Sequence, residues 1–174
     1  MNNTAENKPG MLRTAAIYGL YIGLATVVFS LLNKIVGTNA MLSFLLELIK
    51  LVTTIGILVY AVKRYRNINN GGFITYGQAF SMGMLTSLVA TIVGVVYIIA
   101  NVMANLESLQ ADLYNAYIDL IDKGYIEQAA VDIVVDNISW ALPVVMTLWY
   151  MLLGCIYSLI IAAALVRKKS IFNA

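Results

Sequence analysis

Residues 79–102 read AFSMGMLTSLVATIVGVVYIIANV, a stretch without a single charged side chain. An α-helix needs about 20 consecutive, mostly apolar residues to cross a hydrocarbon core ~30 Å thick, and this stretch meets that requirement. Three more apolar runs of comparable length occupy residues 14–32, 41–62 and 138–166. The four runs predict an all-α fold, a four-helix transmembrane bundle that forms a single membrane domain over residues 14–169.

The composition also indicates a membrane protein. Of the 174 residues, 61% are hydrophobic and 11% are charged, against about 45–50% and about 25% in soluble domains. The mean hydropathy is +0.83. Because so much apolar surface needs lipid around it, the lipid bilayer is the first expected partner. The formal net charge of +2 is too small to indicate a nucleic-acid partner, so none is expected.

The ends of the chain are polar. Residues 1–13 form a predicted cytoplasmic tail, and residues 170–174 form a short C-terminal tail. The first apolar run follows Arg13 and could resemble a secretory signal. The apolar core of such a signal spans about 7–15 residues, whereas this run extends from Thr14 to Leu32. We therefore expect a retained first span.

The segment 103–137, between the third and fourth runs, differs from the rest in its charge. It holds seven of the chain's nine carboxylates and a single cation, Lys123. Its apolar residues recur at helical spacing, which predicts an amphipathic extension of the third span that ends at Lys123 and Gly124. A second short helix then returns the chain to the membrane, giving an acidic helical hairpin outside it. The recurring apolar residues are Leu106, Leu109, Leu113, Tyr117, Leu120 and Ile121.

Two interpretations of the acidic residues in this segment stay open. They form either a solvated polar face, as charge runs usually do, or a site for a divalent cation. Asp132 and Asp136 share one helical face, but no calcium-loop pattern is present. We favour the solvated face and expect no metal site. The seven carboxylates are Glu107, Asp112, Asp119, Asp122, Glu127, Asp132 and Asp136.

The cations predict the orientation of the chain in a bacterial inner membrane. Cations that flank spans are retained on the cytoplasmic side. Lys34 and Lys123 lie in the first and third connections, whereas eight cations lie in the two tails and in a predicted polar loop at residues 63–78. Both termini are therefore expected in the cytoplasm. The eight are Lys8, Arg13, Lys63, Arg64, Arg66, Arg167, Lys168 and Lys169.

Glu47 and Lys50 are the charges that lie inside a run. They are three residues apart and so share one helical face. The apolar part after them, residues 51–62, covers only ~18 Å at 1.5 Å per residue, so the span includes the pair or holds it near the boundary. Ionisable residues inside membranes often mark ion paths, but they also pair with one another structurally. The pair is a candidate functional site under the first interpretation and a satisfied ion pair under the second, which we favour.

Small residues at four-residue spacing predict close helix packing. The first run contains Gly19 and Gly23, a GxxxG spacing that allows a neighbouring helix to approach. Similar ridges occur in the third run at Gly83 and Ser87 and in the fourth at Gly154 and Ser158. We expect the third and fourth ridges to face each other. Pro143 lies in the first turns of the fourth run, where a missing N–H costs little.

Sequence motifs give no support for enzymatic activity. No histidine is present, and the single cysteine, Cys155, lies inside an apolar run. No nucleophile elbow, phosphate-binding loop, dinucleotide fingerprint, CxxC or HExxH pattern occurs. We therefore expect no catalytic residues, no metal ligands and no cofactor.

Three stretches resemble a known family. These are KRYR at 63–66, GGFITYGQAFSMG at 71–83 and SLIIAAALVRKK at 158–169, and they are similar to the bacterial domain-of-unknown-function family numbered 4199. The resemblance extends from about Arg13 to Lys169. It implies a small four-span protein with a Gly-rich entry into the third span and an acidic hairpin before the fourth. The family has no established activity, so no site residue follows from the resemblance.

These observations predict a non-enzymatic integral membrane protein with a structural or interaction role. Its partners would be lipids, other membrane proteins or further copies of the chain. The alternative is a small transporter or channel subunit that uses Glu47 and Lys50. A membrane-bound enzyme ranks third.

Overall fold

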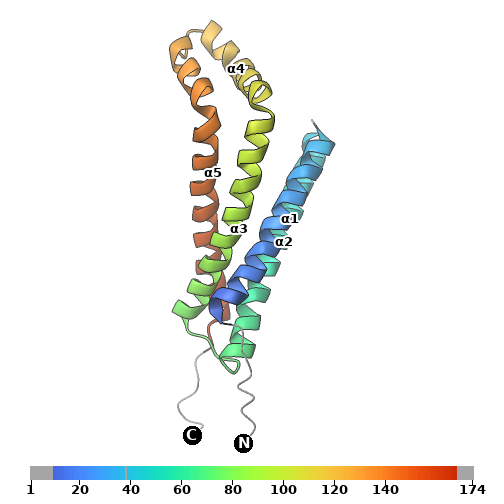
Figure 1. Cartoon of the computed structure of the whole chain (residues 1–174), viewed down its shortest axis with the longest axis vertical. Helices are drawn as coiled ribbons and strands as arrows, with labels where there is room; N and C mark the ends of the chain where they lie inside the picture. The colour runs from blue at the N-terminus through green and yellow to red at the C-terminus, as the bar shows by residue number, and fades with distance from the viewer. Residues whose placement is uncertain (1–9, 38, 168–174) are drawn as a thin grey trace, which may run out of the picture. The chain divides into compact units, whose positions relative to one another are not determined.

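The computed structural model describes residues 10–37 and 39–167, which fold as helices joined by short connections (Figure 1). Four of the described helices are long and apolar enough to cross a membrane by length and composition. The all-α prediction and the four apolar runs are therefore confirmed. In order, the helices are α1 (Met11–Val36), α2 (Ala40–Asn69), α3 (Tyr76–Ala104), α4 (Leu106–Asp122) and α5 (Gln128–Leu165).

The connection between α1 and α2 is short, and the two helices pack side by side. The φ of Gly37 is +65°, a left-handed conformation that glycine adopts without steric cost. The side chain of Asn39 then caps α2 by accepting a hydrogen bond from the backbone N–H of Leu42 at 3.2 Å. Such a cap satisfies one of the free donors at a helix start and so fixes where α2 begins.

The second connection is shorter than the sequence predicted. Helix α2 continues past Val62 to Asn69, so the basic residues at 63–66 lie on a helix rather than in a loop. The helix ends where Gly71 and Gly72 adopt positive φ angles of 58° and 88°. Lysine and arginine are good helix formers, whereas these glycines take a conformation that other residues rarely adopt.

The acidic hairpin begins with a break that the sequence did not predict. Instead of extending α3, the chain bends at Asn105 and starts α4 as a separate helix. The side-chain amide of Asn105 donates to the Asn101 carbonyl at 2.9 Å, a local bond that competes with helix continuation. Helix α4 ends at Asp122 as predicted, and Gly124 takes a φ of 71° just beyond it.

The return of the chain is one continuous helix. The short helix expected before the fourth span is the first part of α5, which begins at Gln128. Pro143 therefore lies inside a long helix rather than in its first turns, which corrects the prediction. The proline ring removes one backbone donor there. The hydroxyl of Thr147 donates to the Pro143 carbonyl at 2.6 Å.

Two compact units make up the chain, and α3 and α5 each contribute to both. The first unit comprises Met1–Gly94 and Tyr150–Ala174, and the second comprises Val95–Trp149. The core of the first unit contains residues from α1, the last turns of α2, the α2–α3 connection, the start of α3 and the end of α5. Its buried members are Ala15, Tyr18, Ile22, Leu58, Ala61, Val62, Ile74, Ala79, Met82, Ile161 and Ala162.

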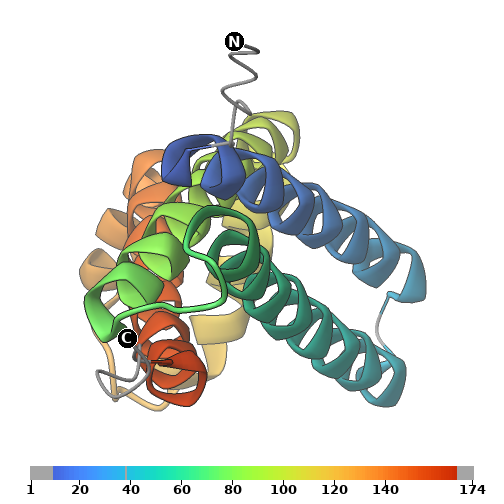
Figure 2. The same cartoon turned by 90° about the horizontal axis from the view of Figure 1, so that it is seen from below.

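A short backbone bridge joins the α2–α3 connection to the segment just after α5. Ile74, in the α2–α3 connection, exchanges two backbone hydrogen bonds of 3.0 Å with Arg167, just after α5. Figure 2 shows the α2–α3 connection beside the end of α5. The end of α2, the start of α3 and the end of α5 therefore lie on the same side of this unit, which we call its closed end.

Candidate functional site

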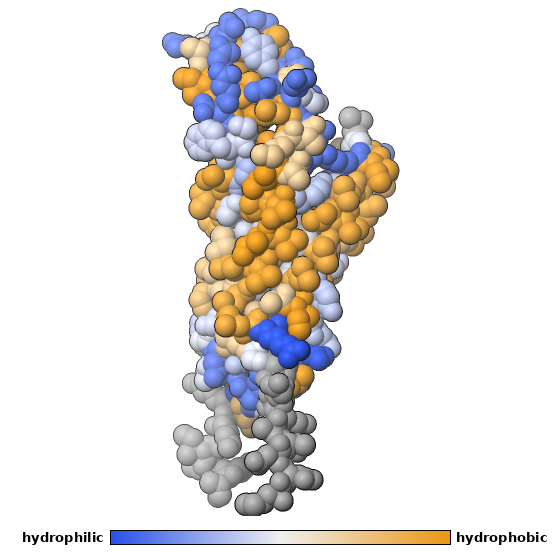
Figure 3. Space-filling view, in the orientation of Figure 1, coloured by the Kyte–Doolittle hydropathy of each residue, from blue (hydrophilic) through white to orange (hydrophobic). Residues whose placement is uncertain are grey.

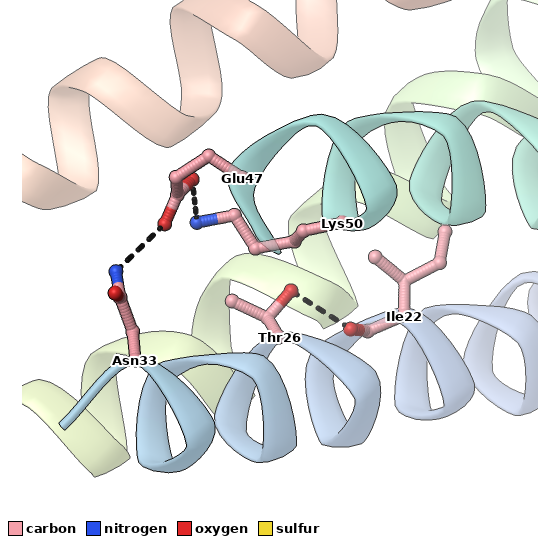
Figure 4. A network of polar contacts seen from close by, with 5 residues as sticks. All are labelled: Ile22, Thr26, Asn33, Glu47 and Lys50. Carbon is pink, nitrogen blue, oxygen red and sulfur yellow. Dashed lines mark hydrogen bonds and ion pairs between the residues drawn. The ribbon is translucent and has the colours of Figure 1, made fainter. Parts of the chain in front are cut away.

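The charged pair inside α2 is joined by a residue from α1. The ammonium of Lys50 forms an ion pair with the carboxylate of Glu47, one helical turn away. The other carboxylate oxygen of Glu47 accepts a hydrogen bond from the side-chain amide of Asn33 at 3.5 Å. Figure 4 shows the Asn33 amide pointing across the hairpin to Glu47. The three side chains form a polar network that links the two helices.

Asn33 was not among the residues that the sequence analysis singled out. The first apolar run ends at Leu32 and so predicts Asn33 in the connection between the first two spans, whereas Asn33 lies in the last turns of α1. The position of Asn33 in the sequence indicates this contact, because in a hairpin with a short connection the end of one helix faces the first turns of the next. A polar residue at the end of α1 was thus a candidate partner for Glu47.

The network does not extend along α1 to Thr26, which lies about two helical turns before Asn33. Thr26 faces α2 in Figure 4, but its hydroxyl donates to the carbonyl of Ile22, in its own helix, at 2.9 Å. Back-bonding of this kind satisfies a hydroxyl in an apolar environment without a partner helix. The Glu47–Lys50 pair therefore has the Asn33 amide on one side, and Glu47 also lies within electrostatic range of the Tyr150 hydroxyl on α5.

The two members of the pair differ in how far their side chains are exposed. The Lys50 side chain is 22% exposed and the Glu47 side chain is 50% exposed. From Ala40 to Ile57, α2 has no buried residue, and its first buried residue is Leu58. The pair therefore lies on a stretch of helix whose apolar side chains are open. Its exposed apolar members near the pair are Phe44, Leu45, Leu48, Ile49, Leu51 and Val52.

The small residues lie where helices approach each other most closely. A Cβ at Gly83 would meet the Ser158 hydroxyl oxygen at 2.6 Å, and a Cβ at Gly154 would meet the Ser87 Cβ at 2.6 Å. Each glycine of one helix thus faces a serine of the other. The Ser158 hydroxyl is fully buried and donates to the Gly154 carbonyl at 2.6 Å, so close packing leaves it satisfied.

The GxxxG residues of α1 face α3 in the same way. A Cβ at Gly19 would lie 2.6 Å from both the Thr86 carbonyl oxygen and the Val89 Cβ. A Cβ at Gly23 would lie 2.5 Å from the Val93 Cβ. These glycines form a packing notch within the first unit. The candidate packing residues of the sequence analysis therefore lie at contacts between α1 and α3 and between α3 and α5.

A second cluster, which the sequence analysis missed, joins α1 and α2 near the closed end of the first unit. The ring of Tyr18 makes edge-on contacts with Tyr21 and Tyr60, with ring centroids 5.8 and 5.6 Å apart. The guanidinium of Arg64 lies close to the Tyr60 hydroxyl, one helical turn earlier on α2, and within electrostatic range of Tyr18 and Tyr21. The signal in the sequence was the helical spacing of Tyr18 with Tyr21 and of Tyr60 with Arg64. We call these four residues the tyrosine–arginine cluster.

The acidic hairpin carries its charges outward. All seven of its carboxylates are exposed, while the six apolar positions predicted for the inner face of α4 are partly buried. Gln110 donates to the Val135 carbonyl at 3.2 Å, and Gln128 donates to the Tyr114 hydroxyl at 3.1 Å, which ties α4 to α5. Hydrophilic side chains gather over α4 in Figure 3. Within residues 10–37 and 39–167, no three acidic, cysteine or histidine side chains come together as metal ligands.

Comparison with known proteins identifies a family. No curated protein and no solved structure matches the chain. Residues 17–167, most of the chain, match the family described as "Protein of unknown function (DUF4199)". With four described helices long and apolar enough to span a bilayer, the chain is a multi-pass membrane protein, and it belongs to the DUF4199 family.

Proposed function

We propose that this chain is a non-enzymatic structural protein of the bacterial inner membrane whose copies associate through the N-terminal half of α2. The observation that carries the proposal is the Glu47–Lys50 pair, in which Glu47 is half exposed and Lys50 is 22% exposed, on a helical stretch without a buried residue. Apolar side chains can face lipid at no cost. A charged side chain in the same surface is costly, which favours a protein neighbour over lipid.

The pair is self-complementary, which favours a second copy as that neighbour. Two copies related by a two-fold axis along the membrane normal present the same surface to each other, with equal residues at equal depth. Glu47 and Lys50 are separated by about one helical turn, ~5 Å along the axis. Their flexible side chains can bridge that offset, so Glu47 of each copy would meet Lys50 of the other.

The charge pattern supports an orientation with both termini in the cytoplasm. Lys34 lies in the last turn of α1 and Lys123 just after α4, whereas eight cations lie near the start of α1, in the last turns of α2 and beyond the end of α5. A reporter fused after Lys169 should be active only in the cytoplasm, and one inserted at Lys123 only in the periplasm. A periplasmic signal after Lys169 would refute this orientation.

A cross-linking experiment tests the association. A photoreactive residue in place of Phe44, one turn before Glu47 and 63% exposed, should join two differently tagged copies in the membrane. The matched control is Ile49, which is 53% exposed and lies on the opposite face of α2 from Glu47. We expect a cross-link from position 44 that is several-fold stronger than from position 49. The double variant Glu47→Gln/Lys50→Met should weaken it.

Two outcomes would overturn the proposal. A cross-link from position 44 only to residues 95–149 of the same chain would mean that the stretch is covered within one copy. Proton or cation flux in proteoliposomes that disappears in Glu47→Gln would instead favour the transporter or channel alternative. Unchanged flux together with association of tagged copies is the expected result.

A further inference from the structure

The tyrosine–arginine cluster combines one buried ring with three exposed polar tips. Tyr18 is 8% exposed and belongs to the core of the first unit, whereas Tyr21 and Tyr60 are each 54% exposed. Arg64 is exposed as well. The buried ring holds the two outer rings by edge-on contacts, an arrangement that aromatic pairs prefer. The two outer rings thus pack against a buried ring, and Tyr21, Tyr60 and Arg64 are exposed to a ligand.

Helix geometry brings these tips together. Side chains on a helix lean toward its N-terminus. On α1 this direction leads toward the closed end of the first unit, so Tyr21 leans toward that end. On α2, whose C-terminus lies at that end, Arg64 leans away from it and toward Tyr21. The hydroxyls of Tyr18 and Tyr21 accordingly lie within electrostatic range of the Arg64 guanidinium.

The closed end of the first unit has an excess of cations, which favours the binding of an anion. The described part of the first unit holds Arg64 and four further cations at its closed end, namely Arg13, Lys63, Arg66 and Arg167. Its described carboxylate is Glu47, which lies in the other half of α2 and pairs with Lys50. Within these residues, Arg64 therefore lies close to a hydroxyl and has no carboxylate partner.

The remaining donors fit a phosphate group. A guanidinium has five N–H donors in a fork, which can reach two oxygens of the same anion beside the Tyr60 hydroxyl. The Tyr60 hydroxyl, close to Arg64, carries a proton that it can donate to the same anion. Tyr21 offers a second hydroxyl proton nearby. Tyrosine and arginine at the end of a span also lie at headgroup level, where lipid phosphates are found.

We propose that Arg64, Tyr60 and Tyr21 bind the phosphate group of an anionic phospholipid, with Tyr18 as the supporting ring. The apolar rings of Tyr21 and Tyr60 would lie along the start of the acyl chains while their hydroxyls meet the phosphate. This site is separate from the Glu47–Lys50 pair and does not depend on the proposed association.

Lipid retention measures the site directly. The full-length protein is reconstituted in nanodiscs of phosphatidylcholine with a small fraction of phosphatidylglycerol, and the bound lipid is counted by native mass spectrometry. Arg64→Gln should weaken retention of phosphatidylglycerol by about tenfold, the order expected for a lost charge-assisted hydrogen bond. Arg64→Lys keeps the charge without the fork geometry and should recover only part of it.

Arg66→Gln is the matched control. It removes the same charge two residues away, from a side chain whose Nε already donates to the Asn67 side-chain oxygen at 3.1 Å. Its retention of phosphatidylglycerol should remain within about twofold of the unmodified protein. Equal losses in Arg64→Gln and Arg66→Gln would overturn the proposal, because they would indicate attraction by net charge alone.

Tyr60→Phe keeps the proposal testable if Arg64→Gln does not fold. It removes one hydroxyl and preserves the ring contact with Tyr18, and it should weaken retention by about threefold while the melting temperature in pure phosphatidylcholine stays unchanged. Unchanged retention in Tyr60→Phe would contradict the site.

A competition experiment with inorganic phosphate at millimolar concentration distinguishes a lipid phosphate from free phosphate as the ligand. If it displaces phosphatidylglycerol completely, the site takes free phosphate and the lipid assignment is wrong.

Discussion

Gly83 of α3 lies against Ser158 of α5 so closely that a Cβ at position 83 would stand 2.6 Å from the serine hydroxyl oxygen. The relationship is reciprocal, because Gly154 of α5 meets Ser87 of α3 at a comparable distance. Between membrane helices no water is released on contact, so close approach of backbones supplies much of the attraction. The alternation of glycine and serine in these two ridges makes that approach possible.

Replacement of a notch glycine should destabilise the first unit. In Gly19→Ala, the new methyl group would meet the Thr86 carbonyl oxygen at 2.6 Å, and backbone cannot move aside cheaply. We expect a loss of about 1–3 kcal/mol in the free energy of unfolding, as for other overpacked sites. The measurement is reversible unfolding in mixed detergent micelles, followed by circular dichroism.

Gly56→Ala is the control for that variant. Gly56 is also a helical glycine, but nothing lies within 4 Å of a Cβ built there. Alanine should therefore leave stability unchanged or raise it by up to about 1 kcal/mol through helix propensity. Equal stabilities of the Gly19 and Gly56 variants would show that the close contact is absent.

The Glu47–Lys50 pair should behave as a coupled unit. Glu47→Gln leaves the Lys50 ammonium without its counter-charge and should cost at least about 1 kcal/mol, but less than the ~3–5 kcal/mol of a fully buried pair, because Glu47 is half exposed. The double variant Glu47→Gln/Lys50→Met should recover most of this loss. A double-mutant cycle of unfolding free energies measures the coupling, and strictly additive losses would contradict it.

The start of α2 should depend on its capping residue. Asn39→Ala removes the acceptor for the Leu42 N–H and should reduce stability by about 1 kcal/mol, whereas Asn39→Asp keeps a capping oxygen and should be tolerated. Hydrogen exchange of the amides at residues 41–43 provides a local measurement. Protection that is identical in both variants would mean that the cap does not define the helix start.

The acidic hairpin should be insensitive to calcium. Its carboxylates are exposed and do not converge as ligands within the described residues, so millimolar Ca²⁺ should shift the melting temperature no more than Mg²⁺ does. Asp132→Asn/Asp136→Asn should melt like the unmodified protein. A shift specific to Ca²⁺ that this double variant abolishes would instead establish a cation site.

The sequence by itself determined the helical class, the number of apolar spans and the inner face of α4. These are local properties, because the length of an apolar run and the spacing of apolar residues follow from the geometry of one helix. The end of α4 just before Lys123 and Gly124 was predictable from local sequence as well. The break at Asn105 was not, since it depends on whether a side chain bonds to its own backbone or to solvent.

Only the tertiary structure decided which residues meet. The Asn33–Glu47 bond, the contact of Tyr18 with Tyr60 and the approach of Gly19 to Val89 each join helices that the sequence describes separately. Any apolar helix can pack on another in several rotations with similar burial. The observed rotation of each helix is selected by the sum of its close contacts with its neighbour. These contacts are a property of the pair of helices, so neither apolar run determines them by itself.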